Sequence, residues 1–405
     1  MTTKDAMYYL RPGTLMLPAL PPLSLYIHLP WCLKKCPYCD FNSHEIRGGA
    51  GRQPDDALQT RYIDALIREA EQALPLVWGR SVHSIFMGGG TPSLFEPAQI
   101  ERLIAALRAR FQLVADCEIT LEANPGTFEQ DRFVAFRAAG VTRLSIGVQS
   151  FDDAKLSALG RVHNGAQARA AIAEAARSFD TFNIDLMYAL PGQTLPELER
   201  DLAEALSFAP PHLSIYHLTI EPNTYFAKFP PQRPDEDSAY AMLDVITEAT
   251  QKVGLQRYEV SAFARSGHHC QHNLNYWQFG DYLGLGAGAH GKLSFPHRIV
   301  RRVGFRNPNE YLAHADKGEF VAQEHEIARQ DLPFEYMLNA LRLTQGFTPQ
   351  EFGERTGLPL GSIEAALTIA EQKGLLHREL TRLAPTTLGM DFLSDLQALF
   401  LPQTP

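Results

Sequence analysis

The feature that most constrains the fold of this chain is a repeat of strand-like and helix-like segments. Over the first two thirds, short runs of β-branched or aromatic residues alternate with amphipathic stretches of helical period. The unit recurs at roughly 30 residues, the length of a β-strand followed by a crossover helix. The predicted strands are Ser24–Leu29, His83–Met87, Glu118–Leu121, Arg143–Val148, Asn183–Met187 and Leu213–Leu218. The predicted helices are Leu58–Leu74, Ala98–Phe111, Gln130–Ala139, Ala166–Phe179 and Leu195–Phe208.

Six such units predict an α/β fold with a parallel sheet. A closed eight-unit barrel takes about 250 residues. Here the repeat fades after Leu218, so we expect a partial, open (β/α)6 barrel.

Polar or glycine residues follow every predicted strand. Because the carboxyl ends of parallel barrel strands open on one face, these residues should gather there, where active sites of barrels lie. In strand order they are Cys32 to Cys39, Gly88 to Pro92, Glu122 to Pro125, Gly147 to Ser150, Asp185, and Tyr216 with His217.

Three of the five cysteines, Cys32, Cys36 and Cys39, lie within eight residues. This spacing is typical of a metal site and not of a disulfide framework. Thiolates are the usual ligands of iron–sulfur clusters, and three of them leave one iron of a cubane open. An open iron can chelate the amino and carboxylate groups of S-adenosylmethionine, whose one-electron cleavage gives a 5′-deoxyadenosyl radical. The spacing therefore predicts a [4Fe–4S] cluster and S-adenosylmethionine as cofactors.

Two other interpretations of these cysteines remain at this point. A structural zinc site would take the three thiolates together with His28 or His44. The thiols could also be free and close together by chance.

The other strand ends offer groups that suit the sulfonium cofactor. Glycines expose the backbone, so the glycine run before Thr91 can hold the methionine amino group, although such a run is also typical of a tight turn. Asp185 can accept hydrogen bonds from ribose hydroxyls, and Arg161 can pair with a carboxylate. Glu122 and Gln149 can fix the methionine or the ribose. For each residue alone, a salt bridge or a strand-end cap is the alternative.

The segment His268–Trp277 shows no regular period and is expected to be irregular. Histidine is a proximal haem ligand, and aromatic rings pack on porphyrins, so His272 to Trp277 can bind haem. An ordinary polar loop is the alternative interpretation.

Charge and hydropathy limit the partners that we expect for this protein and the cellular compartment in which we expect it. The formal net charge of −9 argues against nucleic acid as a main partner. No run approaches the roughly 18 apolar residues of a membrane span, which leaves only peripheral contact with a membrane. The start does not read as a signal peptide, so we expect a cytoplasmic protein.

From about Pro308 the pattern becomes helical and ends in a segment that resembles a winged helix. From Thr348 onward it carries four basic and seven acidic residues. Such a charge balance is poor for DNA binding, which depends on neutralising phosphates.

Three stretches carry a specific family resemblance: Tyr26–Cys32, Cys36–His44 and His272–Trp277. They resemble the radical S-adenosylmethionine haem-chaperone family, HemW, which is related to oxygen-independent coproporphyrinogen III oxidase. The resemblance implies a partial barrel of the radical SAM type followed by a helical, winged-helix-like domain. The expected segments are an extension at 1–22, the barrel at 23–228, a barrel extension with the haem motif at 229–307, and the C-terminal domain at 308–405.

The resemblance also implies roles for individual residues. The cluster ligands would be Cys32, Cys36 and Cys39, and His272 would be the haem ligand. His217 and His290 fall where the oxidase lines the same site, although the residue types differ. The implied cofactor contacts are Tyr26, Tyr38, Gly89, Gly90, Thr91, Glu122, Gln149, Arg161 and Asp185.

The function implied is that of a chaperone that binds haem and transfers it to apo-haemoproteins. The alternative is an enzyme, an oxygen-independent coproporphyrinogen III oxidase that decarboxylates two propionates. The oxidase carries a further cysteine two residues after the third, and this chain has Phe41 there. The substitution argues against the decarboxylase, so the sequence leaves open whether the protein is an enzyme.

Overall fold

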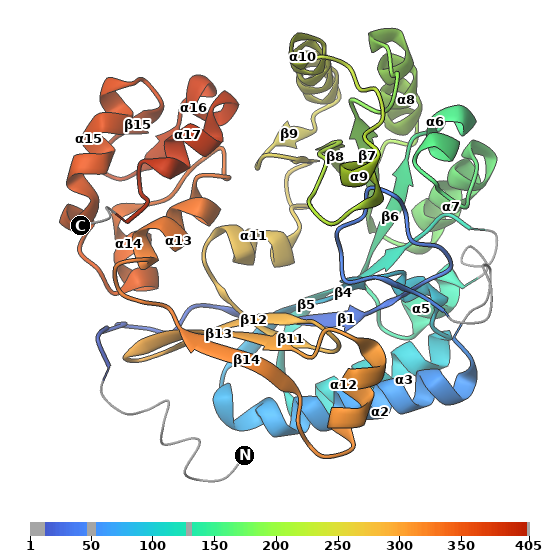
Figure 1. The fold of residues 1–405 in the computed structure, drawn as a ribbon, viewed down its shortest axis with the longest axis horizontal. Coiled ribbons are helices and arrows are strands. Elements are labelled where there is room, and N and C mark those ends of the chain that lie inside the picture. The colour runs from blue at the N-terminus through green and yellow to red at the C-terminus, as the bar shows by residue number, and fades with distance from the viewer. Residues whose placement is uncertain (1–12, 47–53, 127–131, 403–405) are drawn as a thin grey trace.

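The computed structural model describes residues 13–46, 54–126 and 132–402. Within them, twelve strands form one open sheet in the order β14-β13-β12-β11-β1-β4-β5-β6-β7-β8-β10-β9 (Figure 1). Its centre is six parallel strands, which confirms the predicted partial barrel. These are β1 (Leu23–Leu29), β4 (Ser81–Gly89), β5 (Gln112–Ala123), β6 (Arg143–Gln149), β7 (Thr181–Tyr188) and β8 (His212–His217).

Helices connect the parallel strands and cover the outer face of the sheet (Figure 1). Capping boxes begin two of them, at Asn164 with Gln167 and at Thr194 with Glu197. The predicted helix Gln130–Ala139 begins outside the described residues, and the structure has a helix at Phe133–Ala138. The covering helices are α2 (Asp56–Ala73), α3 (Pro97–Arg110), α5 (Phe133–Ala138), α6 (Asp153–Ala158), α7 (Gly165–Ser178) and α8 (Leu195–Ser207), with 3-10 turns at Leu74–Leu76 and Pro92–Leu94.

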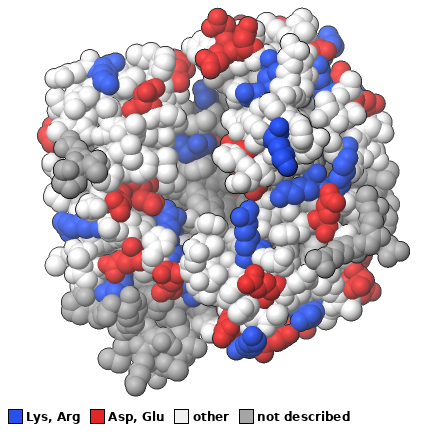
Figure 2. All heavy atoms as spheres, in the orientation of Figure 1, with Lys and Arg blue, Asp and Glu red and all other residues white. Residues whose placement is uncertain are grey.

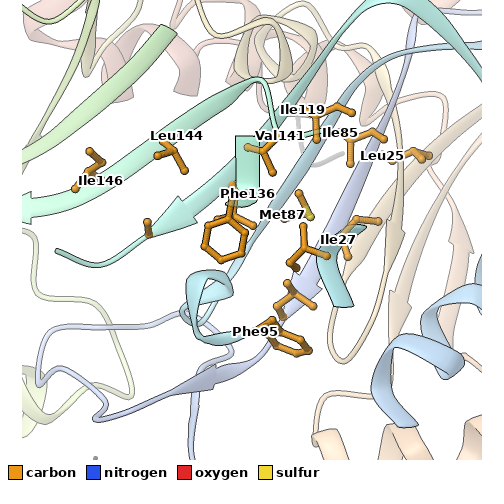
Figure 3. Packing of buried hydrophobic residues seen from close by; sticks show 14 of the residues in the cluster. Leu25, Ile27, Ile85, Met87, Phe95, Ile119, Phe136, Val141, Leu144 and Ile146 are labelled. Carbon is orange, nitrogen blue, oxygen red and sulfur yellow. The ribbon is translucent and has the colours of Figure 1, made fainter. Parts of the chain in front are cut away.

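The main core lies between these helices and the sheet. Side chains of alternate strand residues point outward into it, as Figure 3 shows for Leu25 and Ile27 of β1 and for Ile85 and Met87 of β4. All four are fully buried, and each such side chain stabilises the fold by roughly 1.5–3 kcal/mol.

The residues between them face the inside of the barrel and are mostly polar. Ser84 donates a hydrogen bond of 2.8 Å to the Ser24 hydroxyl there. Glu122, Asp185 and Ser214 lie on the same face of later strands. The apolar side chains of the outer face therefore stabilise the fold, whereas the inner face carries the polar side chains that could bind a ligand.

Further strands extend the sheet at both edges. β11 (Asp281–Leu285) pairs in parallel with β1, and three antiparallel strands follow it: β12 (His290–Phe295), β13 (Arg298–Gly304) and β14 (Val321–Glu326). At the other edge, β10 (Ala262–Ala264) pairs antiparallel with β8 and carries β9 (Gln256–Arg257). Helices α9 (Tyr225–Lys228), α10 (Glu236–Lys252) and α12 (Pro308–Ala315) lie between these strands in the chain.

Two expectations from local pattern were wrong. The segment expected to be irregular contains helix α11 (Gln271–Trp277), whose two turns are too short to show a period. Strand β14 lies in a region expected to be helical. It is an edge strand with almost no buried residue, so its sequence lacks the alternation of a half-buried strand.

The C-terminal part packs around a second core. Its elements are α13 (Leu332–Ala340), α14 (Pro349–Thr356), a 3-10 turn at Leu360–Ile363, α15 (Glu364–Gln372), the hairpin β15 (Leu376–Arg378) with β16 (Leu383–Pro385), α16 (Thr387–Asp391) and α17 (Leu393–Ala398). The helix–helix–hairpin order agrees with the winged-helix-like pattern. Leu15, Leu17, Phe279 and Ile299 from the rest of the chain belong to this core.

Among the described helices, none is long and apolar enough to cross a membrane.

Candidate functional site

The cysteine loop follows the first barrel strand and is fixed at both ends. Strand β2 (Trp31–Cys32) pairs in parallel with β3 (His44–Glu45). The buried Trp31 ring packs against Tyr62 and Phe95, with ring centroids 4.8 and 5.7 Å away. These contacts hold the loop against the barrel at the carboxyl end of β1.

Hydrogen-bond donors from other strand ends reach the thiols of this loop. The Thr91 hydroxyl donates to Cys32 Sγ at 3.5 Å, and Arg161 Nη1 donates to Cys36 Sγ at 3.7 Å. Burial raises the pKa of the Cys32 thiol to about 11, although the Thr91 hydrogen bond opposes the shift. Such a thiol ionises when a positive centre stabilises its thiolate, which a bound metal does.

The three cysteines of the loop are half-buried. Among the described residues, no three His, Cys, Asp or Glu side chains converge tightly enough to hold one metal ion. The thiolates of a cubane cluster each bind a different iron, so they stand further apart than the ligands of a single ion.

Arg161 and Asn124 connect three strand ends behind the loop. Arg161 Nη2 donates to Asn124 Oδ1 at 2.6 Å and to the Gly147 carbonyl at 2.7 Å. Asn124 Nδ2 in turn donates to the Thr91 hydroxyl at 2.9 Å. Sequence reasoning did not assign Asn124 a role, although its place directly after a strand was a usable signal.

Two half-buried carboxyl groups lie deeper in the barrel mouth. Burial raises the pKa of Glu122 to about 8, and the nearby Asp185 charge adds to the shift. Burial also raises the pKa of Asp185 to about 6, against hydrogen bonds from Asn183 at 2.7 Å and Ser145 at 3.1 Å. Two such carboxyl groups favour a positively charged ligand between them, because it would stabilise both ionised forms.

The glycine run at the end of β4 has a packing role of its own. A Cβ on Gly89, whose φ is +110°, would lie 2.3 Å from the His28 ring, and one on Gly90 would lie 2.6 Å from the backbone of residues 30 and 31. The Gly89 N–H donates to Glu122 at 3.2 Å, and those of Gly90 and Thr91 donate to carbonyls of β1 and β2. A bound amino group would therefore meet carbonyl oxygens here and not N–H groups.

Gln149 and two tyrosines complete the set of expected contacts. Gln149 has a φ of 69°, a conformation that residues other than glycine rarely adopt, at a bulge where β6 meets β7. The Tyr26 hydroxyl lies 3.0 Å from His28 Nδ1. The Tyr38 ring lies 6.5 Å from Phe226, beside Arg161.

His272 lies on the inner face of the sheet and is 1% exposed. Its Nδ1 lies 3.0 Å from the Ser84 hydroxyl, and its ring stacks on Phe86 with centroids 5.0 Å apart. Its Nε2 is buried without a hydrogen-bond partner. Burial, with a further contribution from Arg143, lowers the pKa of His272 to about 3, so the ring is neutral at physiological pH.

The haem motif and the barrel mouth are neighbours through Tyr26. The Tyr26 ring lies 5.9 Å from that of His28 and 6.4 Å from that of His272. His217 and His290 lie at strand ends of the same sheet, and both side chains are exposed.

Glu118 was not singled out from the sequence, yet it positions α11. It accepts hydrogen bonds from the backbone N–H groups of Gln271 and His272, each at 3.2 Å, and from the Cys270 thiol at 3.6 Å. The sequence contained only a weak indication of this role. Glu118 lies an even number of residues before Glu122, so both side chains point to the inner face of β5.

Comparison with protein families gives two matches. The Radical SAM superfamily matches residues 26–205, and the HemN C-terminal domain matches residues 327–392.

Several relatives are similar over nearly their whole length. Heme chaperone HemW of Haemophilus influenzae is 44% identical, with 96% of this chain and 100% of the relative aligned. Heme chaperone HemW of Escherichia coli is 45% identical, over 95% and 99% of the two chains. The protein of the same name from Bacillus subtilis is 34% identical, over 87% and 92%.

A solved structure shares the fold. Coproporphyrinogen III oxidase (HemN) from Escherichia coli, described as a radical SAM enzyme, superposes with a TM-score of 0.80 at 24% identity, over 99% of this chain and 93% of that one. At 24% identity this match shows only that the two proteins share a fold. The full-length relatives decide the family, and the chain belongs to the heme chaperone HemW family of the radical SAM superfamily.

Proposed function

We propose that this protein is a haem chaperone that carries a [4Fe–4S] cluster and S-adenosylmethionine and passes haem to apo-haemoproteins. The observation that carries the proposal is the set of contacts at the cysteine loop, where Thr91 and Arg161 donate to two of the thiols and Asn124 links these two residues to each other. The relatives named heme chaperone HemW support the haem-chaperone part of the proposal.

Cys32, Cys36 and Cys39 would hold the cluster. Thr91 and Arg161 fit this role, because each already directs a donor at a thiol, and hydrogen bonds and positive charge stabilise thiolates. When bound, the group supplies one-electron chemistry and an open iron for the cofactor.

The sulfonium cofactor would occupy the barrel mouth. The positive charge of S-adenosylmethionine suits the paired carboxyl groups of Glu122 and Asp185, and Asp185 can accept hydrogen bonds from ribose hydroxyls. Carbonyl oxygens of Gly89 and Gly90 would accept from the methionine amino group. Tyr26, Tyr38, Thr91, Gln149 and Arg161 would line the remaining wall.

His272 would bind the haem iron. A neutral imidazole with an unpaired Nε2 is the form that ligates iron, and the Tyr276 ring supplies aromatic surface beside it, with centroids 4.9 Å apart. Because the side chain is buried, haem reaches it only when α11 moves away from β4.

Metal content tests the cluster. After anaerobic reconstitution, the protein should contain iron and sulfide and turn brown. Replacing Cys32, Cys36 and Cys39 together with alanine should abolish both, whereas Cys117→Ala, a change at a cysteine remote from the loop, should not. Full iron loading of the triple variant would rule out these ligands.

Haem titration tests the chaperone, and an oxidase assay tests the alternative. His272→Ala should weaken the Soret shift on haem binding, while His269→Ala, a change on the same segment, should leave it intact. Haem should then move to an apo-haemoprotein on mixing. Efficient anaerobic conversion of coproporphyrinogen III to protoporphyrinogen would overturn the proposal in favour of the oxidase.

A further inference from the structure

We propose that Arg143 binds a propionate carboxylate of haem while His272 binds the iron, so that the barrel interior selects a tetrapyrrole with free carboxylates. Arg143 is the first residue of β6. The inference deepens the proposed chaperone function and rests on it.

Alternation along β6 directs the Arg143 side chain to the inside of the barrel. The next residue, Leu144, belongs to the outer core, as Figure 3 shows, so Arg143 and Ser145 point the other way. The Ser145 hydroxyl accordingly donates to Asp185 at 3.1 Å in the barrel mouth. The Arg143 guanidinium therefore lies on the same inner surface as His272, whose pKa its positive charge helps to lower.

Arg143 is a buried cation without a hydrogen-bond partner. It is 2% exposed, and its Nε is buried without a partner. Within the part of the chain that the structure describes, no hydrogen bond or ion pair reaches its guanidinium. Arg298 is buried to the same extent, yet it pairs with Glu326 at 3.3 Å. Because fully buried charges in proteins are normally paired, the Arg143 guanidinium indicates a ligand of opposite charge.

The two carboxyl groups that act on the charge of Arg143 have other hydrogen-bond donors. Glu118 accepts from two backbone N–H groups of α11, and Asp185 accepts from Asn183 at 2.7 Å. Neither of them forms an ion pair with Arg143. A further carboxylate can therefore bind the guanidinium without displacing either group.

Two other unpaired polar atoms lie on the same inner surface. Thr120, the β5 residue that pairs with Arg143 across the sheet, is fully buried, and its hydroxyl has no partner among the described residues. The second atom is His272 Nε2, and the His272 ring stacks on Phe86, the β4 residue that pairs with Thr120. A guanidinium and a hydroxyl donate to a carboxylate, whereas an imidazole nitrogen binds iron. Haem offers both groups on one molecule.

The hydrogen bonds of His272 leave Nε2 as the atom that can bind iron. The Ser84 hydroxyl donates to Ser24 at 2.8 Å, so its oxygen accepts from His272 Nδ1 at 3.0 Å. The proton therefore lies on Nδ1, and Nε2 keeps the lone pair that a metal needs.

The two proposed ligand groups belong to elements that can separate. When α11 moves away from β4, His272 moves with the helix, whereas Arg143 and Thr120 stay on the sheet. Haem between them would be held through its iron from one side and through a propionate from the other. Figure 2 shows a hollow between the C-terminal part and strands β8 and β9, in the region where Figure 1 places α11, with Lys or Arg spheres in it. Positive charge along this approach attracts an anionic ligand.

Esterified haem tests the role of the carboxylate. Haem dimethyl ester has the same iron and ring as haem but no free carboxylate. Each compound is titrated into the anaerobically reconstituted full chain, and the Soret shift gives its dissociation constant. The unmodified chain should bind haem about tenfold or more tightly than the ester, because a hydrogen bond to a charged group contributes at least about that factor.

Variants of Arg143 separate ligand binding from a structural role. Arg143→Gln should lose the preference by weakening haem binding alone, and Arg143→Lys, which keeps the charge, should retain most of it. Arg137→Gln, an exposed change on α5, is the matched control and should bind both compounds like the unmodified chain. His272→Ala should weaken both compounds without changing their ratio.

Equal affinity of the unmodified chain for haem and its ester would assign Arg143 to another anion and overturn the inference. This comparison does not depend on the folding of any variant. An Arg143→Gln variant that weakens both compounds alike would overturn it too, since that is the result of a structural role. No Soret shift with either compound would instead overturn the proposed haem chaperone.

Discussion

At the scale of single residues, two carboxyl groups with raised pKa values distinguish the barrel mouth from the rest of the sheet. Glu122 and Asp185 are held beside each other with raised pKa values, because burial penalises their ionised forms. Elsewhere in the sheet a buried carboxylate is fully paired. Asp281 accepts hydrogen bonds from Ser294 and Lys292 at 2.8 Å and lies 2.9 Å from Arg80. Lys292 and Arg80 therefore hold the pKa of Asp281 below its ordinary value, whereas burial raises the pKa values of Glu122 and Asp185 despite their hydrogen bonds.

Binding of S-adenosylmethionine should strengthen as the pH rises from about 6.5 to about 7.5. Below its pKa of about 8, Glu122 is mostly protonated, and a cationic ligand favours the ionised form. Affinity should therefore rise by up to about tenfold per pH unit, the limit for one linked proton. Titration calorimetry measures the slope, which Glu122→Gln should flatten. An unchanged slope in that variant would assign the linkage to another group.

Lys292→Met should destabilise the fold by about 3–5 kcal/mol, because it removes one partner from a buried charge network. Lys292 is 1% exposed and donates to Asp281 and to the Phe279 carbonyl, the latter at 3.0 Å. Burial alone would raise the pKa of Asp281, but Lys292 and Arg80 hold it below its ordinary value. Denaturant unfolding measures the loss.

The exposed pair of Lys252 with Glu248 provides the control for that measurement. Lys252→Met should leave stability almost unchanged, because solvent screens exposed pairs. An equal decrease in the free energy of unfolding in both variants would mean that the buried Asp281 network stabilises the fold no more than the exposed pair does.

At the scale of elements, helix α11 is the part whose position decides the proposed function. It packs against β4 on one side and against α13 of the C-terminal part on the other (Figure 1). Glu118 holds its first turn, and the His272 contacts with Ser84 and Phe86 hold its face. Its seven residues are too few for stability on their own, so these contacts fix the helix.

Glu118→Ala should loosen α11 and speed haem binding. Loss of a helix cap costs about 1 kcal/mol, which corresponds to roughly fivefold faster amide exchange by local opening. Hydrogen exchange of residues 271–277 and stopped-flow haem association should both accelerate. Glu101→Ala, an exposed change on α3, should alter neither. Faster exchange without faster haem binding would show that haem enters by another route.

At the scale of the whole molecule, the two hydrophobic cores share parts of the chain. Leu15, Leu17, Phe279 and Ile299 come from outside residues 327–400 but belong to the core of that part. The Phe279 ring, for example, packs edge-on against Tyr336 with centroids 5.7 Å apart. The C-terminal part therefore covers apolar surface of the barrel extension and is not an appendage on a linker.

A chain ending after Glu326 should expose this surface. We expect it to bind a hydrophobic fluorescent dye and to aggregate in size-exclusion chromatography, because four buried apolar side chains lose their cover. As a control, the full chain with Leu380→Ser should remain monodisperse, since Leu380 is fully exposed. A shortened chain that stays monodisperse and dye-free would contradict the shared core.

The parts of the protein that the sequence alone determined are those with local causes. The alternation of strand and helix patterns predicted the six parallel strands, because side-chain periodicity follows from backbone geometry within each segment. The Cys32, Cys36 and Cys39 spacing also has a local cause, since the three thiols lie within eight residues, and the metal site that it indicates stays a prediction. The rule that parallel strands end at one face agrees with the hydrogen bonds from Thr91 to Cys32 and from the Gly89 N–H to Glu122.

Tertiary structure decided what depends on distant partners. The helical state of α11 rests on Glu118, 154 residues before His272, and no local pattern contains that contact. The burial of His272 comes from Ser84 and Phe86 of another strand, and β14 exists as a strand because β13 offers it an edge. Local periodicity reports which face of a segment is apolar. Only the folded chain shows what covers that face, and here it shows that β4 and α11 bury the His272 side chain, which the sequence could not indicate.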